Sequence, residues 1–416
     1  MQFVSTRRPS EQVSFKEALL RGLAPDGGLY VPTAIPSLPP DTWELAESFA
    51  DLARRILTPW LEEEIAPAAL DGILRQALDF PVPTVKVGEI FVLELFHGPT
   101  LSFKDYGART MARLMNHFCT DEQLTILVAT SGDTGSAVAD GFAGQPNLRV
   151  AVLYPSGQVS PLQEKQLTVK RPGVRTFAVE GTFDDCQAMV KSLLTSPGDL
   201  RLSAANSINV GRLLPQMLYY FWACARRDWH QPVICVPCGN LGNLTAGVLA
   251  HLSGLPVGQF LAAHNANDGF PRFLAQSGVG FRDSVRTLSN AMDVGRPSNF
   301  ERLQWLLGDT GLRALICGHS VSDATTLESM RRVYEAHGYI ADPHTAVALE
   351  AVQSVHAPVL VLATAHPAKF ADTVQRALGR AAPSAAALEG LRRMPYRVTP
   401  MKATARALRN NLRGWA

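Results

Sequence analysis

The sequence lacks the features that would place a protein in a membrane or on a nucleic acid. No run of about eighteen apolar residues occurs among its 416 residues, and the N-terminal MQFVSTRRPSEQ has charges but no apolar stretch of a signal peptide. We therefore expect a protein that is neither secreted nor membrane-spanning. The formal net charge is only +2, so no global field favours nucleic acid. A small, uncharged-to-anionic metabolite is the better partner.

Cysteine is also sparse. The six cysteines, at positions 119, 186, 224, 235, 238 and 317, form no dense framework of the kind that small secreted domains use, which favours a reducing cytoplasm. Cys235 and Cys238 form a CxxC pair, but within VICVPCGN, a pattern typical of a buried strand that runs into a glycine turn. Because no second Cys or His pair has zinc-ligand spacing, we expect no metal site.

What the chain does contain, from about residue 89, is a series of short apolar runs separated by polar or helical stretches. The runs are TILVAT, RVAVLYP, VRTFAVE, VICVP, QFLAAHN and PVLVLAT. Parallel strands read as unbroken apolar runs because helices cover both faces of their sheet. The pattern therefore predicts βαβ units in an α/β fold, arranged as two lobes with a cleft between them.

Residues 1 to about 80 follow a different pattern and predict a small N-terminal domain. SFKEALLRGLAPDGGLYVP indicates a helix, a glycine turn and a short strand, and FPVPTVKV at 80–87 reads as a linker. At the other end, no acid follows Glu389 while seven Arg and Lys residues do, which predicts a solvated helix face rather than an RNA-binding tail.

Two glycine-containing turns at strand ends are candidates for anion binding. Residues 239–243, GNLGN, lie between the strand VICVP and a helix beginning near Thr245, where converging N–H groups and the helix dipole favour a phosphate. Ser131, Asp133 and Thr134 occupy a similar turn after TILVAT and are placed to hold a carboxylate. The alternatives are an ordinary turn and simple helix capping.

Two further strand-end segments carry single candidate residues. In ELFHGPTLSFKDYGART, Lys104 lies between Phe103 and Asp105, and a lysine desolvated beside aromatic rings forms a Schiff base readily. In PVLVLATAHPAKF, Thr364 ends a strand, and a neutral hydroxyl suits an unprotonated ring nitrogen. The alternatives are a solvated lysine and a structural threonine.

Taken together, FHGPTLSFKD, ATSGDTG, GNLGN and ATAHPAKF resemble, in this order, the pyridoxal-phosphate motifs of the threonine synthase family. The likeness extends over nearly the whole chain through STR, DGGLYVP, SPLQEKQ, ANSINVGR and LSNAMDVGRPSN. The resemblance implies pyridoxal-phosphate fold type II, similar to the tryptophan synthase β chain. We expect an N-terminal domain over 1–88, a first α/β lobe over 89–215 and a second lobe over 216–416, with the cofactor in the cleft.

The same resemblance implies a set of site residues. Lys104 would be the Schiff-base lysine and catalytic acid-base, and Asp133 would lie by the ring hydroxyl of the cofactor. The cofactor would further contact Gly239, Asn240, Leu241, Gly242, Asn243 and Thr364. The substrate would contact Thr130, Ser131, Thr134, Lys165, Asn206, Ser207, Asn209 and Arg212. Because an ionised Asp133 would repel a phenolate, the resemblance leaves its protonation open.

The implied reaction converts O-phospho-L-homoserine and water to L-threonine and phosphate, in a cytoplasmic monomer or homodimer that binds pyridoxal 5'-phosphate. Three alternatives stay open: a phospholyase releasing keto acid and ammonia, a serine or threonine dehydratase, and a catalytically silent binding module. Lys165 and Arg212 argue against the dehydratase, which needs no second anion site.

Overall fold

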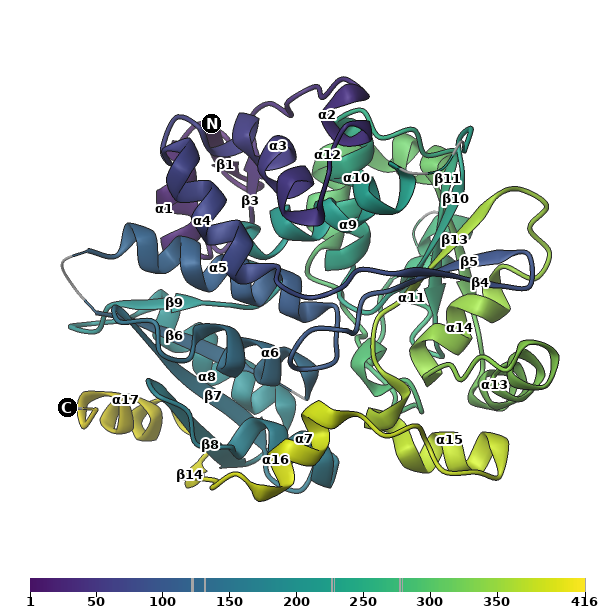
Figure 1. Ribbon diagram of the computed structural model, residues 1–416. Helices are drawn as coiled ribbons and strands as arrows, with labels where there is room; N and C mark the ends of the chain where they lie inside the picture. The colour runs from purple at the N-terminus through teal and green to yellow at the C-terminus, as the bar shows by residue number, and fades with distance from the viewer. Residues whose placement is uncertain are drawn as a thin grey trace.

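The computed structural model in Figure 1 describes residues 1–120, 123–130, 132–225, 227, 229–276, 278 and 280–415. Its strands form three sheets with the orders β2-β1-β3, β12-β11-β10-β13-β5-β4 and β14-β8-β7-β6-β9. None of the helices seen in the described ranges combines the length and the apolar character that a membrane span requires.

The smallest sheet belongs to the N-terminal part, whose helices share a core with the rest of the chain. Its elements are β1 (Gln2–Ser5), β2 (Gln12–Ser14), α1 (Phe15–Arg21), β3 (Tyr30–Pro32), α2 (Asp41–Glu44), α3 (Phe49–Leu61) and α4 (Pro67–Ala77). Ser14 and Ser48 cap α1 and α3 by accepting hydrogen bonds from N–H groups of the first turn. The rings of Trp43 and Phe221 meet at 5.0 Å. The predicted helix, turn and strand are confirmed.

The six-stranded sheet is parallel except for its edge strand β4. Its strands are β4 (Thr84–Val87), β5 (Ile90–Glu94), β10 (Val233–Pro237), β11 (Gln259–His264), β12 (Ile316–Ser320) and β13 (Val359–Ala363). Its helices are α10 (Gly242–Leu252), α11 (Gly269–Ala275), η2 (Asn290–Met292), α12 (Phe300–Leu315), α13 (Asp323–His337), α14 (Pro343–Ala351), η3 (Pro367–Phe370) and α15 (Ala371–Leu378). The predicted linker is partly wrong, because residues 84–87 pair antiparallel with β5.

The five-stranded sheet is parallel throughout. Its strands are β6 (Leu124–Ala129), β7 (Leu148–Pro155), β8 (Val174–Glu180), β9 (Leu202–Ala204) and β14 (Thr399–Lys402). Its helices are α5 (Lys104–Phe118), α6 (Asp133–Phe142), α7 (Pro161–Thr168), α8 (Phe183–Thr195), η1 (Val210–Arg212), α9 (Leu214–Cys224), α16 (Ala386–Arg393) and α17 (Ala405–Arg413). All six predicted apolar runs form strands of the two large sheets, and both faces of those strands are buried.

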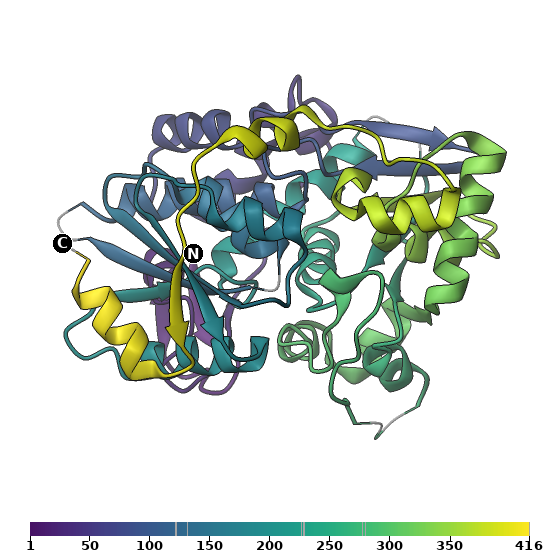
Figure 2. The same ribbon diagram turned by 90° about the horizontal axis from the view of Figure 1, so that it is seen from below.

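The chain crosses between the two large sheets more than once. Strand β5 lies in the six-stranded sheet beside β13, although residues 89–215 were assigned to the first lobe. Strand β14 joins β8 at the edge of the five-stranded sheet, and Figure 2 shows the C-terminal segment running across the molecule from α15 to reach it. The positions of β5 and β14 depend on strands far along the chain. The domain boundaries 1–88, 89–215 and 216–416 stay a prediction.

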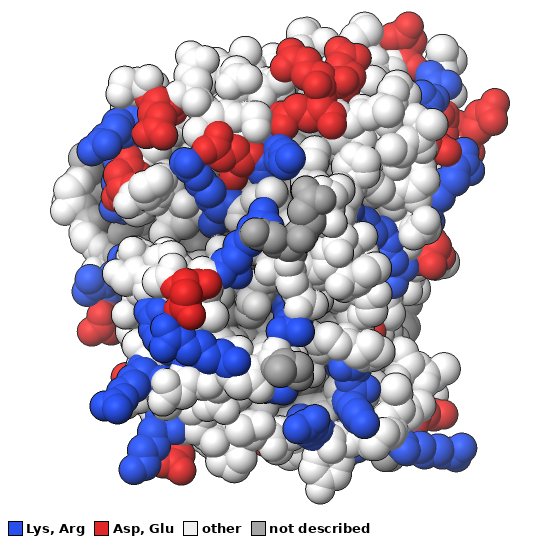
Figure 3. All heavy atoms as spheres, turned by 90° about the vertical axis from the view of Figure 1, so that its left-hand side faces the viewer, with Lys and Arg blue, Asp and Glu red and all other residues white. Residues whose placement is uncertain are grey.

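The C-terminal helix α17 has the solvated charged face that the sequence predicts. Leu408 and Leu412 point inward, whereas Arg406 and Arg413 are exposed and Arg413 pairs with Asp199 at 2.6 Å. Figure 3 shows this side of the molecule, where Asp and Glu gather mainly in the upper part and Lys and Arg predominate in the lower part, separated by uncharged residues. The C-terminal arginines therefore hold α17 against its own lobe.

Candidate active site

A cavity of about 550 Å³ lies where strands of the two large sheets end. Ala129 and Thr130 reach it from the end of β6, Pro237 and Cys238 from the end of β10, and Thr364 from the end of β13. Ligands of α/β folds bind at the carboxyl ends of parallel strands, where helices also begin. The cavity is therefore placed to receive a ligand that both lobes hold.

Lys104, the first residue of α5, points into this cavity from a largely desolvated position. Its side chain is 14% exposed, and Nζ lies 4.8 Å from the centre of the Phe103 ring. Burial lowers the pKa of Lys104 to about 8, although the nearby Asp133 carboxylate raises it in part. The amine therefore loses its proton near neutral pH, as attack on an aldehyde requires.

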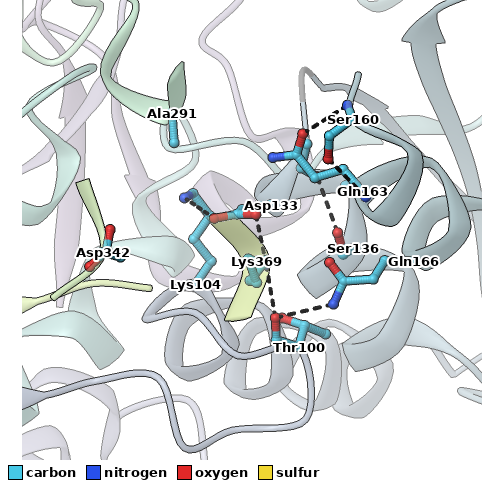
Figure 4. A network of polar contacts seen from close by, with 12 residues as sticks. Thr100, Lys104, Asp133, Ser136, Ser160, Gln163, Gln166, Ala291, Asp342 and Lys369 are labelled. Carbon is cyan, nitrogen blue, oxygen red and sulfur yellow. Dashed lines mark hydrogen bonds and ion pairs between the residues drawn. The ribbon is translucent and has the colours of Figure 1, made fainter. Parts of the chain in front are cut away.

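Asp133, the first residue of α6, lies between two lysines (Figure 4). Its Oδ2 is 3.8 Å from Lys104 Nζ, and its Oδ1 is 2.7 Å from Lys369 Nζ. Burial alone would raise the pKa of Asp133, but the ammonium groups of Lys369 and Lys104 outweigh it and hold that pKa below its usual range. Asp133 is therefore ionised in this environment.

The turn 239–243 forms the start of α10 and presents its N–H groups to the cavity. Leu241 has φ 58°, and the structure gives the N–H groups of residues 239–244 no acceptor among the described residues. A Cβ on Gly239 would lie 2.9 Å from Met292 Cα, so only glycine fits there. Such a turn at a helix N-terminus matches a phosphate in shape and charge.

Asn243, at the end of this turn, has one orientation because two buried tyrosines hold it. The hydroxyls of Tyr219 and Tyr220 donate to its Oδ1 at 2.5 and 2.8 Å, while Nδ2 is buried and finds no acceptor within the described residues. The unpartnered Nδ2 is a further donor for an anion. Thr364 also lines the cavity, and its carbonyl accepts the Phe103 N–H at 3.0 Å, which ties the end of β13 to the residue before Lys104.

Arg212 is the predicted substrate-side cation that reaches the cavity. Its side chain is buried, Nη1 donates to the Ala205 carbonyl at 2.7 Å, and Nε finds no acceptor among the described residues. Burial lowers its pKa to about 10, so the guanidinium stays charged at neutral pH. Asn206 and Ser207 line the cavity beside it. A buried cation without a paired carboxylate in direct contact is suited to an anionic ligand.

Not every predicted residue reaches the cavity. Thr130 and Thr134 line it, although the Thr130 hydroxyl accepts the N–H groups of Gly132 and Gly135 within the turn. Lys165 instead donates to the Met394 carbonyl at 3.0 Å. Asn209 uses its amide on the carbonyls of residues 19 and 204. Ser131 lies outside the described residues.

Sequence reasoning gave no role to three features of the site. Lys369 lies within the quoted ATAHPAKF segment, but its contact with Asp133 joins distant parts of the chain. The Tyr219 and Tyr220 pair reads as ordinary core. His344 Nδ1 lies 2.6 Å from Asp342 Oδ1, and its Nε2 accepts the Ala291 N–H at 3.2 Å, which fixes the turn η2 against Gly239. Only an i, i+2 Asp-His spacing hints at this pair in the sequence.

These features fit pyridoxal phosphate: a desolvated amine for the aldehyde, N–H donors for the phosphate and an ionised carboxylate beside the amine. Fold and site together define a pyridoxal-phosphate-dependent enzyme of fold type II. The family model described as "Pyridoxal-phosphate dependent enzyme" matches residues 77–364, and models for "Threonine synthase N terminus" and "Threonine synthase, C-terminal" match residues 2–78 and 345–411. The chain belongs to the threonine synthase family, as its motifs predict.

Relatives and solved structures agree with this assignment. The threonine synthase of Serratia marcescens is 42% identical, and the match covers 100% of this chain and 99% of the relative. The structure of threonine synthase from Escherichia coli superposes with a TM-score of 0.93 at 40% identity, covering 100% of both chains. A structure described as PLP-bound threonine synthase from Brucella melitensis has a TM-score of 0.94 at 34% identity, covering 99% of both.

Proposed function

We propose that this enzyme converts O-phospho-L-homoserine and water to L-threonine and inorganic phosphate. The observation that carries the proposal is that two anion-binding groups, the turn 239–243 and Arg212, line the same cavity as one desolvated lysine. A phosphorylated amino acid bound beside a phosphorylated cofactor needs both groups.

The residues divide between cofactor and substrate. We assign the cofactor phosphate to the N–H groups of 239–243 and the Asn243 amide, the ring nitrogen to Thr364 and the ring hydroxyl to the neighbourhood of Asp133. We assign the substrate carboxylate to the start of α6 around Thr134. We assign the substrate phosphate to Arg212, Asn206 and Ser207. Lys165 and Asn209 are engaged elsewhere, so we assign them no direct contact.

The bound cofactor supplies an electron sink for the charge that develops on the substrate carbons. With the cofactor bound, Lys104 would hold its aldehyde, and the free Lys104 amine would be the base that removes the proton from the substrate Cα. With a pKa of about 8, its amine accepts and returns protons near neutral pH. Arg212 holds the γ-phosphate as it leaves.

We further propose that the enzyme works in the cytoplasm as a monomer or homodimer and binds neither nucleic acid nor membrane. Six unpaired cysteines, five of them buried, support a reducing compartment. On the face shown in Figure 3, uncharged residues separate the Lys and Arg side chains, which form no continuous basic stripe there.

The test is to incubate cofactor-loaded protein with O-phospho-L-homoserine and to assay threonine, keto acid and phosphate together. We expect equimolar threonine and phosphate, with a rate loss of about 100-fold or more in Lys104→Ala and none in the exposed Lys402→Ala. Keto acid and ammonia would identify a phospholyase, and turnover of unphosphorylated threonine would identify a dehydratase. Absence of any product would contradict the proposal.

A further inference from the structure

Lys369 forms the far end of a row of three charged side chains, Lys369, Asp133 and Lys104, which come from η3, α6 and α5 (Figure 4). Its side chain is 0% exposed, and Nζ contacts Asp133 Oδ1 at 2.7 Å and the Thr100 carbonyl at 3.0 Å. A fully buried ammonium is costly unless it is paired, and Asp133 is its pair. Asp133 therefore contacts both lysines and joins Lys369 to Lys104.

Lys369 does not line the cavity, whereas Lys104 and Asp133 do. Both Asp133 oxygens are buried, and the two ammonium groups of Lys369 and Lys104 are the cations that lie within ion-pair distance of them among the described residues. The other charged or titratable groups around the row are Arg212 on η1, Asp105 on α5 and His344 on α14. Among the described residues, none of these three lies within ion-pair distance of Asp133 or Lys104.

The negative charge of Asp133 acts on Lys104, and Lys369 weakens this effect. An ionised Asp133 beside Lys104 alone would stabilise the ammonium form of Lys104 and so keep it from acting as a base. It would also repel a negatively charged ring oxygen. Because Lys369 contacts the other oxygen, the carboxylate belongs to an ion pair of net charge zero. Asp133 therefore stabilises the ammonium form of Lys104 less.

We propose that Lys369 is a positioning residue that neutralises Asp133 and thereby lets the Lys104 nitrogen release its proton near neutral pH. The inference rests on the proposed function of Lys104 as the cofactor-bearing base. Lys369 touches neither substrate nor cofactor. Its effect reaches the reaction through the charge of Asp133 and the direct field of its own ammonium, and both act in the same direction on Lys104.

The test follows the proton on the Lys104 nitrogen directly. In cofactor-loaded protein, the midpoint is read from the visible absorption band as the pH is varied. In cofactor-free protein, it is read from the pH dependence of Lys104 acetylation by acetic anhydride, quantified by peptide mass spectrometry. The second readout needs no bound cofactor, so it separates failure of this inference from failure of the proposed function.

We expect Lys369→Met to raise both midpoints by about one pH unit or more, since it removes a cation and leaves Asp133 unneutralised. Lys369→Arg, which keeps the charge, should stay within about 0.3 unit of the parent, and Lys402→Met, an exposed lysine on β14, should not shift. Asp133→Asn combined with Lys369→Met should return the midpoint toward the parent value.

An unchanged or lowered midpoint in Lys369→Met would overturn the proposal, as would an equal shift in Lys369→Arg, which would point to packing rather than charge. If Lys369→Met does not fold, a comparison in the Asp133→Asn background decides. The midpoint of Asp133→Asn should fall further than that of the Asp133→Asn/Lys369→Gln double variant, because only the former keeps the direct field of the Lys369 ammonium on Lys104, and equal midpoints in the two variants would overturn the proposal.

Discussion

The orientation of Asn243 gives the sharpest prediction about cofactor binding. Tyr219 and Tyr220 donate their hydroxyls to its Oδ1, and burial raises the pKa of both phenols well above the usual value, so both stay protonated donors. A carboxamide whose oxygen accepts two hydroxyls must turn its NH₂ group the other way, and Asn243 is one of the residues that line the cavity. We therefore expect the double variant Tyr219→Phe/Tyr220→Phe to weaken cofactor binding without touching the cofactor.

The size of the effect follows from the bonds involved. A hydrogen bond from an amide to a charged phosphate contributes about 1.5 to 3 kcal/mol, and its loss corresponds to a roughly 10- to 100-fold weaker Kd. Either tyrosine alone still specifies the orientation, because one hydroxyl remains on Oδ1. Tyr219→Phe should therefore change Kd by about threefold or less, and the double variant should change it by more than the two single effects combined.

The assay is equilibrium titration of cofactor-free protein with pyridoxal 5'-phosphate, followed by absorbance. Asn243→Ala sets the full loss of the amide, and Tyr396→Phe, at an exposed position outside the site, serves as the matched control. The reasoning fails if the double variant binds as tightly as the parent while Asn243→Ala does not. It also fails if the two single effects simply add.

Three further predictions use other parts of the site. Gly239→Ala should weaken cofactor binding strongly, because its Cβ would meet the backbone of Met292. The control Gly72→Ala, in open space on α4, should stabilise the protein by about 0.5 to 1 kcal/mol in thermal unfolding. Equal effects of the two substitutions on cofactor binding would contradict this prediction. Arg212→Lys should raise KM for the phosphorylated substrate roughly 10- to 100-fold in steady-state kinetics, and a loss confined to kcat would contradict it. Burial raises the pKa of Asp105 to about 6, although Thr100 donates hydrogen bonds to its carboxylate. Between about pH 4 and 6 the folded protein therefore binds more protons than the unfolded chain. The free energy of unfolding falls as the pH rises through that window. In thermal melts of cofactor-free protein, Asp105→Asn should lack this fall, and parallel pH profiles would refute it.

The sequence predicts the strands of this fold well wherever both faces are covered. Strands β6, β7, β10 and β13 are unbroken apolar runs, since helices remove their faces from water. Strand β12 (ICGHS) was not predicted: four of its five residues are exposed, and its pairing with β11 alone makes it a strand. Edge strands of this kind depend on a partner that a local pattern does not contain.

The site residues also fall into two groups: those that the local sequence predicts and those whose position depends on distant parts of the chain. Residues of the turns 130–134 and 239–243 were found because a turn at a strand end is local information, readable from glycines and hydroxyls. Whether Lys165 or Arg212 reaches the cavity depends on which face of its helix the neighbouring elements cover. Lys165 donates a hydrogen bond to the Met394 carbonyl in the C-terminal segment. Gly107, by contrast, leaves space on α5 for the Arg212 side chain. Such competition between distant partners is visible only in the folded chain.

The two candidate anion sites are one hydrogen-bonded unit, although they come from different lobes. Asn240 Nδ2 donates to Ser207 Oγ at 2.7 Å, and Asn299 Nδ2 donates to the Asn240 carbonyl at 3.0 Å.

Arg302, fully buried, holds this unit to the N-terminal part of the chain. Its guanidinium donates to the Ser207 carbonyl at 2.9 Å, to Asn299 Oδ1 at 2.7 Å and to the Tyr30 carbonyl at 3.0 Å. Carbonyl dipoles and one amide satisfy this cation, so breaking any contact would leave a buried charge short of partners. Under the proposed function, this network, which includes β3, would set the spacing between the two phosphates. The N-terminal part would then share a core with the lobes because it fixes the distance over which one lysine serves both ligands.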